Sequence, residues 1–525
     1  MKISYIQYGI IIILVSALTA CKKYLDVNID PENPTKVPAA SRIIGAITTS
    51  NGAAQWRGSR EIAGVTQYGL TGKTTGSNRN AETWRFTSSY FLWQNTYVNT
   101  LPNCVDLTVL GNEEGNLHFV GVGKTLMALN FGLLADQYGS IVVDDFYDGI
   151  NPIQLTPKFN TQQEVYERIQ TLLDEALIAF DGENQININA NDGDIIYGGD
   201  IEKWKKFAWA LKARYLNHLS KKSGLYNPDA IIDACQHAFD GDGMDAEFPY
   251  LAAKRVDDIN SNPWSSWGGF SSTDDPRYLT WSQFFINMLS SFPVTNKLYQ
   301  DPRISKIMKP GKDDVYRGLS PGAGLEGGQG RLPDGSAGDP LLKDSTLYSR
   351  FSNSGFYTNE TSPFPFITYA EVKFIEAEAR LRNADVAGAL SAYEEGVKAN
   401  MRKLGVESSA INQYWQAQLS DGLSGHFNDL NKGLSHIMRQ KYIALCLHPE
   451  TWVDMRRMDY SKEIYGPSFT RPTNLNTVIF DQNNENQWIQ AMVYENNEQT
   501  RNPDAVGDNT EKYRLLTPLW WNVTE

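Results

Sequence analysis

The sequence predicts a mainly α-helical protein in which four tetratricopeptide-like helix pairs form a scaffold. Apolar residues recur at spacings of three and four in four places along the chain, which is the pattern of helices with one buried face. The predicted helices come in pairs with alanine-rich contact faces, and such pairs bury those faces by stacking on one another. A long stretch rich in Gly, Pro, Ser and Asn interrupts them. The alternative is an irregular α-domain without repeats.

The helix pairs fall in two blocks, at about residues 118–240 and 366–458. Thr161 and Glu164 have the spacing of a capping box, and Asp200 is placed to cap the following helix. The predicted helices pair as 124–138 with 161–180, 200–224 with 228–239, 369–382 with 387–404, and 435–447 with 450–458. Between the blocks, about residues 245–365 form the loop-rich insert, in which the glycine-rich segment 318–338 fits neither helix nor regular strand.

The first 21 residues predict export and lipid anchoring. Lys2 precedes an apolar run from Ile6 to Leu18, which is shorter than the about 20 residues needed to span a bilayer. Leu18-Thr19-Ala20-Cys21 resembles the lipobox of bacterial lipoproteins, whereas a transmembrane anchor or a buried helix would leave this small-small-Cys ending unexplained. Residues 1–20 are therefore predicted to be a signal peptide, and Cys21 to carry the acyl chains that hold the protein on a membrane.

Charge and cysteine content exclude several classes of protein. The formal net charge of -13 has no basic stripe to offset it, so nucleic acid is not an expected partner. Beyond Cys21, the remaining cysteines are widely spaced and form no CxxC or Cys/His cluster. We expect Cys104, Cys235 and Cys446 to be buried free thiols, with a single disulfide as the alternative.

Motifs for catalysis or cofactor binding fail on inspection. Gly123-Lys124 lacks the glycine that a phosphate-binding loop needs five residues earlier, where His118 stands. The aspartates near residue 240 resemble the start of a calcium loop, but Met244 occupies a ligand position. The HExxH pattern is absent, and the Gly-x-Ser-x-Gly match at Gly318–Gly322 lies in the glycine-rich segment, where no hydrophobic strand precedes it and no helix follows. We therefore expect no enzyme activity, no catalytic residues, no metal ligands and no cofactor.

A series of short segments resembles the SusD/RagB family of outer-membrane lipoproteins, in the family's order and over essentially the whole mature chain. Each segment is weak alone. The segments are Cys21–Asn28, Asp30–Pro34, Ala135–Gly139, Tyr197–Ala208, Asp301–Arg303, Thr368–Ala379, Gln440–Ala444 and Trp452–Arg457.

The resemblance implies one SusD-like domain over residues 21–525, with four tetratricopeptide-like pairs carrying a loop-rich second face. It also implies a surface-exposed, lipid-anchored protein of the outer membrane that has no catalytic activity. Family members capture nutrients, most often oligosaccharides, and cap a SusC-like TonB-dependent channel. Trp452, Asp454, Arg456 and Arg457 are expected to be structural, because a bidentate Arg–carboxylate pair can lock helices together.

The family motifs do not identify the ligand site, so its residues are chosen by chemistry. Sugar receptors need exposed flat aromatic rings for the apolar faces of the sugar. Trp264, Trp267 and Phe270 lie among Ser, Gly and Asn, and Tyr278 follows closely. Trp84 is a second candidate. The alternative, weighed evenly, is that these rings pin the loops onto the helical body.

Three functions follow from these observations. The first is a binding protein for a glycan, working as the hinged lid of a partner channel. The second is capture of a peptide or another non-sugar ligand in the same lid role. The third is a surface glycoside hydrolase, which would require a pair of carboxyl groups about 5 to 9.5 Å apart in a cleft.

Overall fold

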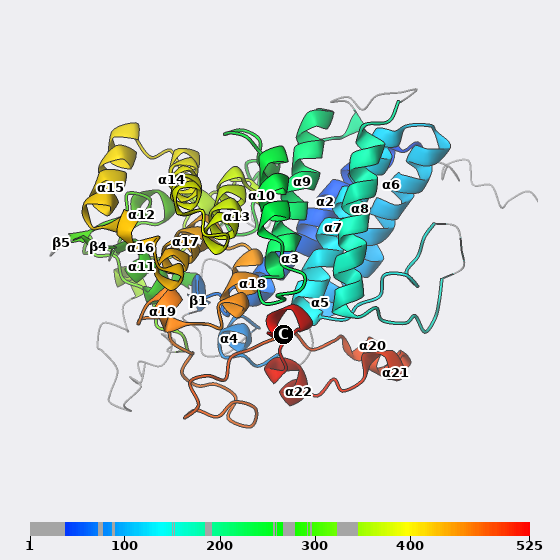
Figure 1. Cartoon of the computed structure of the whole chain (residues 1–525). Coiled ribbons are helices and arrows are strands. Elements are labelled where there is room, and N and C mark those ends of the chain that lie inside the picture. Colours follow the sequence, from blue (N-terminus) through cyan, green and yellow to red (C-terminus); the bar gives the residue numbers. More distant parts are fainter. Residues whose placement is uncertain are drawn as a thin grey trace, which may run out of the picture.

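The computed structural model describes residues 37–71, 77–86, 90–149, 151, 153–183, 192–255, 258, 260–265, 279–290, 292–294, 297–322 and 345–524. Over these residues the chain is mainly helical, which confirms the predicted fold class (Figure 1). The predicted signal peptide and Cys21 lie outside the described residues. The tetratricopeptide-like character of the pairs stays a prediction.

The first group of helices precedes residue 240. It comprises α2 (Ala40–Thr49), η1 (Ser50–Gln55), α3 (Trp56–Ile62), α4 (Ser77–Glu82), α5 (Tyr90–Asn95), η2 (Thr96–Thr100), α6 (Leu101–Glu113), α7 (Leu117–Tyr138), α8 (Gln162–Phe180), α9 (Ile201–His218) and α10 (Pro228–His237). The predicted capping box of Thr161 and Glu164 is present, and the Asp200 side chain accepts a hydrogen bond from the Lys203 backbone. The helix that Asp200 caps ends at His218, six residues before the glycine expected to stop it.

Antiparallel packing joins α7, α8 and α9. Lys124 pairs with Glu175 at 2.6 Å, and further along α7 the Tyr166 hydroxyl of α8 donates to Asp136. Helix α7 is long and apolar enough to cross a membrane, but 78% of its most apolar window is buried inside the protein. It is therefore placed as the core helix of this group.

The remaining helices follow residue 280. They are α11 (Gln283–Ser290), α12 (Ile304–Ile307), η6 (Ser345–Leu347), η7 (Phe356–Thr358), α13 (Tyr369–Arg382), α14 (Val386–Lys403), α15 (Ser408–Ser420), α16 (Leu423–His426), α17 (Leu430–Ala444), α18 (Glu450–Arg457), α19 (Lys462–Tyr465), α20 (Asn496–Arg501), α21 (Pro503–Val506), α22 (Glu511–Leu516) and η8 (Trp520–Asn522). Helix α13 matches its predicted range, and Gly396 of α14 lies against the Phe374 ring of α13.

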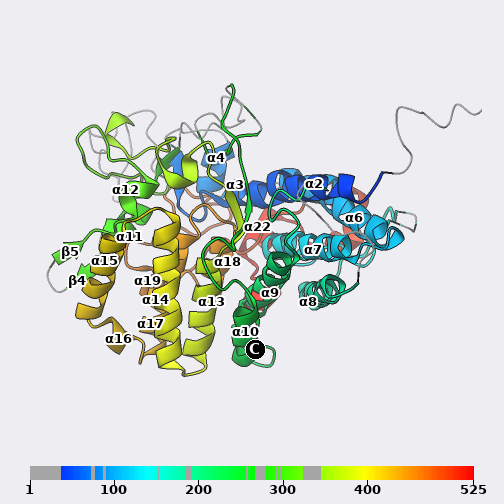
Figure 2. The ribbon, with the colours of Figure 1, turned by 90° about the horizontal axis from the view of Figure 1, so that it is seen from above.

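Short antiparallel ladders hold the loop-rich side of the described chain. β1 (Gly69–Thr71) pairs with β3 (Leu279–Trp281), β2 (Ala246–Phe248) with β6 (Phe364–Ile367), and β4 (Phe292–Val294) with β5 (Lys297–Tyr299). In Figure 2, α4, α12 and the connections around them line one side of the molecule, while the ends of α10, α13 and α14 point to the other. This agrees with the expected loop-rich second face.

The C-terminal segment returns to the first group of helices. The Met492 backbone N–H donates to the Gln137 carbonyl at 2.8 Å, and the Tyr494 ring stacks on Tyr138 with 5.7 Å between the ring centres. Trp521 is fully buried. Figure 1 shows this red segment crossing below α5 and α18. Residues near 490–522 thus pack into the same core as α7.

Candidate functional site

The largest concentration of buried charge lies where α7, α9, α13, α17 and α18 meet. Arg214 of α9 binds Glu371 of α13 through two hydrogen bonds of 2.7 and 2.8 Å. His218, one turn later, lies 2.5 Å from Glu450 through Nε2. Its Nδ1 faces the Tyr166 hydroxyl at 2.8 Å. All of these side chains are buried, so their charges must be paired to be tolerated.

His218 is protonated in this cluster. Burial alone would lower the pKa of His218, but the Glu450 and Asp136 carboxylates outweigh it and raise that pKa to about 9. Asp136, His218 and Glu450 could each offer one ligand atom to a metal ion, because these atoms lie within 4.8 Å of one another. However, both imidazole nitrogens already have partners, and the Arg214 guanidinium lies 3.8 Å from Glu450. We therefore interpret the cluster as an ionic lock between helices.

The Trp452–Arg457 segment has the structural role expected of it. Arg457 binds both oxygens of Glu378, at 2.9 and 2.8 Å, and reaches Asp454 at 2.7 Å. Although burial works against the charged form, the Arg457 guanidinium holds the pKa of Glu378 well below its ordinary value. The guanidinium of Arg456 lies 3.7 Å from the centre of the Trp452 ring. The prediction that these residues belong to the scaffold is confirmed.

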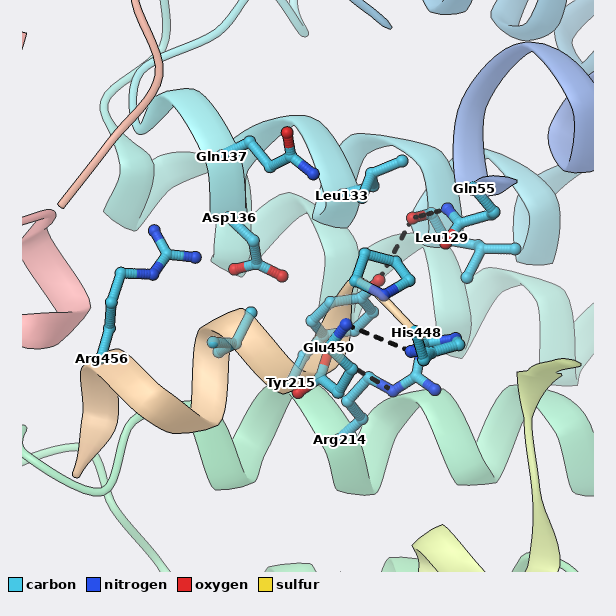
Figure 3. A pocket seen from close by; sticks show the side chains of 12 residues that line it. Gln55, Leu129, Leu133, Asp136, Gln137, Arg214, Tyr215, His448, Glu450 and Arg456 are labelled. Atoms are coloured by element: carbon cyan, nitrogen blue, oxygen red, sulfur yellow. Dashed lines mark hydrogen bonds and ion pairs between the residues drawn. The ribbon is translucent and has the colours of Figure 1, made fainter. Parts of the chain in front are cut away.

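The cavity beside this cluster is too small for a nutrient. Figure 3 shows Asp136 and Gln137 of α7 reaching toward it from one side and Arg456 of α18 from another, with Glu450 and Arg214 close by. Its volume of about 10 Å³ holds roughly one water molecule. A sugar ring cannot enter, so neither binding nor catalysis on a glycan can occur here.

A larger groove lies between α13 and α14, with a volume of about 470 Å³. Its charged residues pair with one another, for example Lys373 with Glu376 at 2.8 Å and Lys398 with Glu394 at 2.5 Å. None of its lining residues is aromatic. The groove therefore lacks the ring surface that sugar binding requires.

The aspartates that resemble a calcium loop face basic side chains instead. Asp240 pairs with Lys206, and Asp242 with Arg402 at 2.6 Å. Asp245 lies 2.6 Å from Lys403. Cys104, Cys235 and Cys446 are buried free thiols, as predicted.

Under the loop-rich side, an aromatic cluster fills the space where several candidate residues were expected to be exposed. The Trp264 ring meets Trp56 and Phe351 edge-on, each at 6.1 Å between ring centres, and is 3% exposed. Trp281 continues the cluster at 4.3 Å from Phe351. The Trp264 backbone is fixed by Asn262, whose side chain also donates to the Tyr357 carbonyl.

The expectation that Trp264 and Trp84 expose their rings is therefore wrong, because both rings are buried. Trp84 is fully buried between Phe480, at 5.2 Å, and Trp488, at 5.4 Å. A ring without an exposed face cannot stack on a sugar in this conformation, so both tryptophans act as loop anchors. Trp267, Phe270 and Tyr278 lie outside the described residues.

Glu82 ties together the chain segments that frame this side. Its buried carboxylate accepts hydrogen bonds from the Thr71 backbone at 3.0 Å and from the Gly322 backbone at 2.6 Å. Thr71 in turn lies opposite Leu279 in the β1–β3 ladder. The Glu82 carboxylate thus joins the backbone at residue 71 to the backbone at residue 322, which is far away in the sequence.

Phe91 of α5 supplies an exposed ring. Among the aromatic side chains that the structure describes, Phe91 and Tyr513 are the exposed ones, at 53% and 46%. The Arg57 guanidinium lies 5.0 Å from the centre of the Phe91 ring and 5.2 Å from that of Trp56. A sugar presents an apolar face edged by hydroxyl groups. A half-exposed ring can stack on that face, and the adjacent guanidinium can donate hydrogen bonds to the hydroxyls.

Sequence reasoning missed Phe91, although a signal was present. Trp93, Tyr97 and Leu101 keep helical spacing, which predicts a buried stripe; Trp93 and Leu101 are buried and Tyr97 is partly buried. Phe91 lies two residues before Trp93, which is about 200° around a helix. An aromatic residue on the side opposite a buried stripe is one that the fold exposes.

Comparisons with known proteins agree with this architecture. The SusD-like family model, described as starch-binding and associating with the outer membrane, matches residues 32–500. A SusD homologue of Bacteroides fragilis has a similar structure, with a TM-score of 0.69 at 17% identity, covering 93% of this chain and 100% of that one. For a SusD homologue of Parabacteroides distasonis the TM-score is 0.69 at 21% identity, covering 93% and 97%.

A protein named as chitin-binding also has a similar structure, with a TM-score of 0.64 at 20% identity, covering 92% of this chain and 100% of that one. At such identities the likeness concerns the fold alone. No curated protein sequence matches this chain.

Proposed function

Since this chain belongs to the SusD-like family of starch-binding proteins that associate with the outer membrane, we propose that it captures an oligosaccharide at the cell surface. It delivers that ligand to a partner TonB-dependent channel of the outer membrane, over which it works as a hinged lid. An acylated Cys21 holds it on the membrane. The family is one of binding proteins, and we propose no catalytic step.

The observation that carries this proposal is the exposed Phe91 ring beside Arg57. Stacking of a sugar on an aromatic ring buries apolar surface, and the guanidinium can donate hydrogen bonds to hydroxyls at the edge of the sugar. Phe91 lies on α5, with its ring under the Arg57 guanidinium of α3. Trp267, Phe270 and Tyr278 remain proposed ligand contacts.

The test is a glycan array on the mature protein, with Phe91→Ala as the variant. A stacked ring contributes roughly 0.5–1.5 kcal/mol beyond its buried area, so affinity for the best glycan should fall about 3- to 10-fold. Tyr513→Ala is the matched control, because Tyr513 is the other exposed aromatic residue of the described chain and lies on α22. Its affinity should equal that of the unmodified protein.

Equal losses in both variants, or none in either, would show that Phe91 is not a ligand contact. A peptide array run in parallel separates the two ligand classes. Binding to peptides without binding to any glycan would contradict the oligosaccharide proposal while leaving the role as a lid intact.

A further inference from the structure

Two strongly exposed aliphatic side chains mark the loop between α7 and α8. Ile153 exposes 71% of its surface and Leu155 exposes 89%. The residues from 153 to 156 are all exposed. Single exposed apolar residues are ordinary on protein surfaces, so the position of this pair decides whether it has a role.

This loop lies beside the point where the N-terminal segment joins the body. Asp106 of α6 pairs with Arg42 of α2 at 3.4 Å and accepts a hydrogen bond from the Tyr147 hydroxyl of the loop at 3.0 Å. The Ala39 backbone, just before α2, donates to Glu114 after α6 at 2.9 Å. Figures 1 and 2 both show the loop and the start of α2 at the same end of the molecule.

The length of the N-terminal segment keeps this end near a membrane. Residues 21–36 would connect an acylated Cys21 to the first described residue, Val37. A chain of that length spans at most about 55 Å when extended, and averages roughly 20–25 Å when flexible. An anchor at Cys21 therefore brings the side of the body that carries Ile153 and Leu155 within reach of the bilayer.

The charges around the loop indicate which contact it can make. Asp144 and Asp148 are exposed nearby and outnumber the exposed Lys158 of the same loop, so the charges give no net attraction to anionic headgroups. Exposed Ile and Leu side chains gain instead by leaving water for the boundary between headgroups and acyl chains. Such a contact is apolar and insensitive to salt.

We propose that Ile153 and Leu155 form a membrane contact, which touches the bilayer interface and sets how the anchored body is held on the membrane. The contact rests on the lipid anchor of the proposed function. It adds a second, shallow attachment at the end of the molecule where the anchor enters.

The test uses the full acylated protein on phosphatidylcholine vesicles that contain brominated lipid. An environment-sensitive fluorophore is attached at Leu155→Cys, and in a matched control at Val478→Cys, since Val478 is 84% exposed in a different loop. The native thiols beyond Cys21 are buried and do not compete for the label. We expect a blue-shifted emission and several-fold stronger quenching at position 155 than at position 478, unchanged at high salt.

Three outcomes would overturn the membrane contact. Equal, water-like emission at both positions in protein that floats with the vesicles would refute the contact and leave the anchor standing. Shielding of position 155 only in membranes that hold the partner channel would assign the loop to the channel. Protein that does not float with the vesicles would refute the anchor, and the membrane contact with it.

Discussion

His218 lies between two carboxylates from helices that are far apart in the sequence, Asp136 on α7 and Glu450 on α18. The folded protein therefore binds a proton that the unfolded chain releases near pH 6.5. Because the pKa of His218 is raised, its contribution is fully present below about pH 6.5. It is lost as the pH rises through about 9.

We expect the free energy of unfolding to fall between pH 6.5 and 9.5 by an amount on the order of 3 kcal/mol owing to His218. This fall is measured by urea unfolding of the unmodified protein and of the His218→Gln variant across this pH range. The glutamine variant should be less stable near pH 6.5 and show a flatter decline. Parallel declines in the two proteins would mean that His218 is not the group responsible. Burial raises the pKa of Cys104, Cys235 and Cys446, so these thiols ionise in the unfolded chain alone toward the upper end of this range, which also lowers the free energy of unfolding there.

Individual aromatic residues were the hardest to place from sequence. Trp264 lies in a segment without periodicity, and its burial comes from Trp56 and Phe351, which are remote in the chain. No local pattern could have shown those contacts. Phe91, by contrast, carried a usable signal in its position opposite the Trp93 stripe.

Helices and their ends were predictable because their signals are local. The capping box at Thr161 and the ranges of α10 and α13 follow from residues within a few positions of each boundary. The end of α9 was misplaced because Gly224 is a general stop signal, whereas the chain turns earlier at Leu219. The distance between two packed helices depends on which single residues touch. The sequence pattern alone does not reveal those contacts.

The approach of α7 to α9 depends on Gly132. A methyl group there would lie 2.1 Å from the Tyr215 hydroxyl oxygen and 2.2 Å from its ring carbon. Gly132→Ala should therefore lower stability by about 1–3 kcal/mol, despite the better helix propensity of alanine. Gly52→Ala is the matched control, since nothing lies within 4 Å of the added carbon, and it should be neutral or slightly stabilising. The midpoint temperatures of thermal unfolding are compared for the two variants. Equal shifts would contradict the close contact between Gly132 and Tyr215.

At the scale of the whole molecule, several of the segments that resemble the SusD/RagB family contribute, within the described residues, to the buried scaffold. Asp136, Arg303, Glu371, Gln440 and Arg457 all lie in those segments, and all are buried in paired or hydrogen-bonded contacts. This explains why sequence reasoning reached the fold and stopped before the ligand. The segments that carry the resemblance serve packing, whereas the proposed ligand contacts lie outside them.

The proposed partner is tested on the whole anchored protein. Gentle detergent extraction of membranes, followed by affinity capture of this protein, should recover a large β-barrel channel. The Cys21→Ala variant should be released from the membrane or accumulate as the precursor, and should recover much less of the channel. Capture of the intact protein without any barrel would contradict the lid role, and normal fractionation of the variant would contradict the anchor.

The return of the C-terminal segment to α7 has a consequence for biosynthesis. Helices near residues 117–218 cannot close their core until Tyr494 and Trp521 have been synthesised, because those rings complete it. Contacts between residues so far apart in the chain form late and slowly. In a nascent chain of this design, the first group of helices therefore lacks part of its core until synthesis is nearly complete.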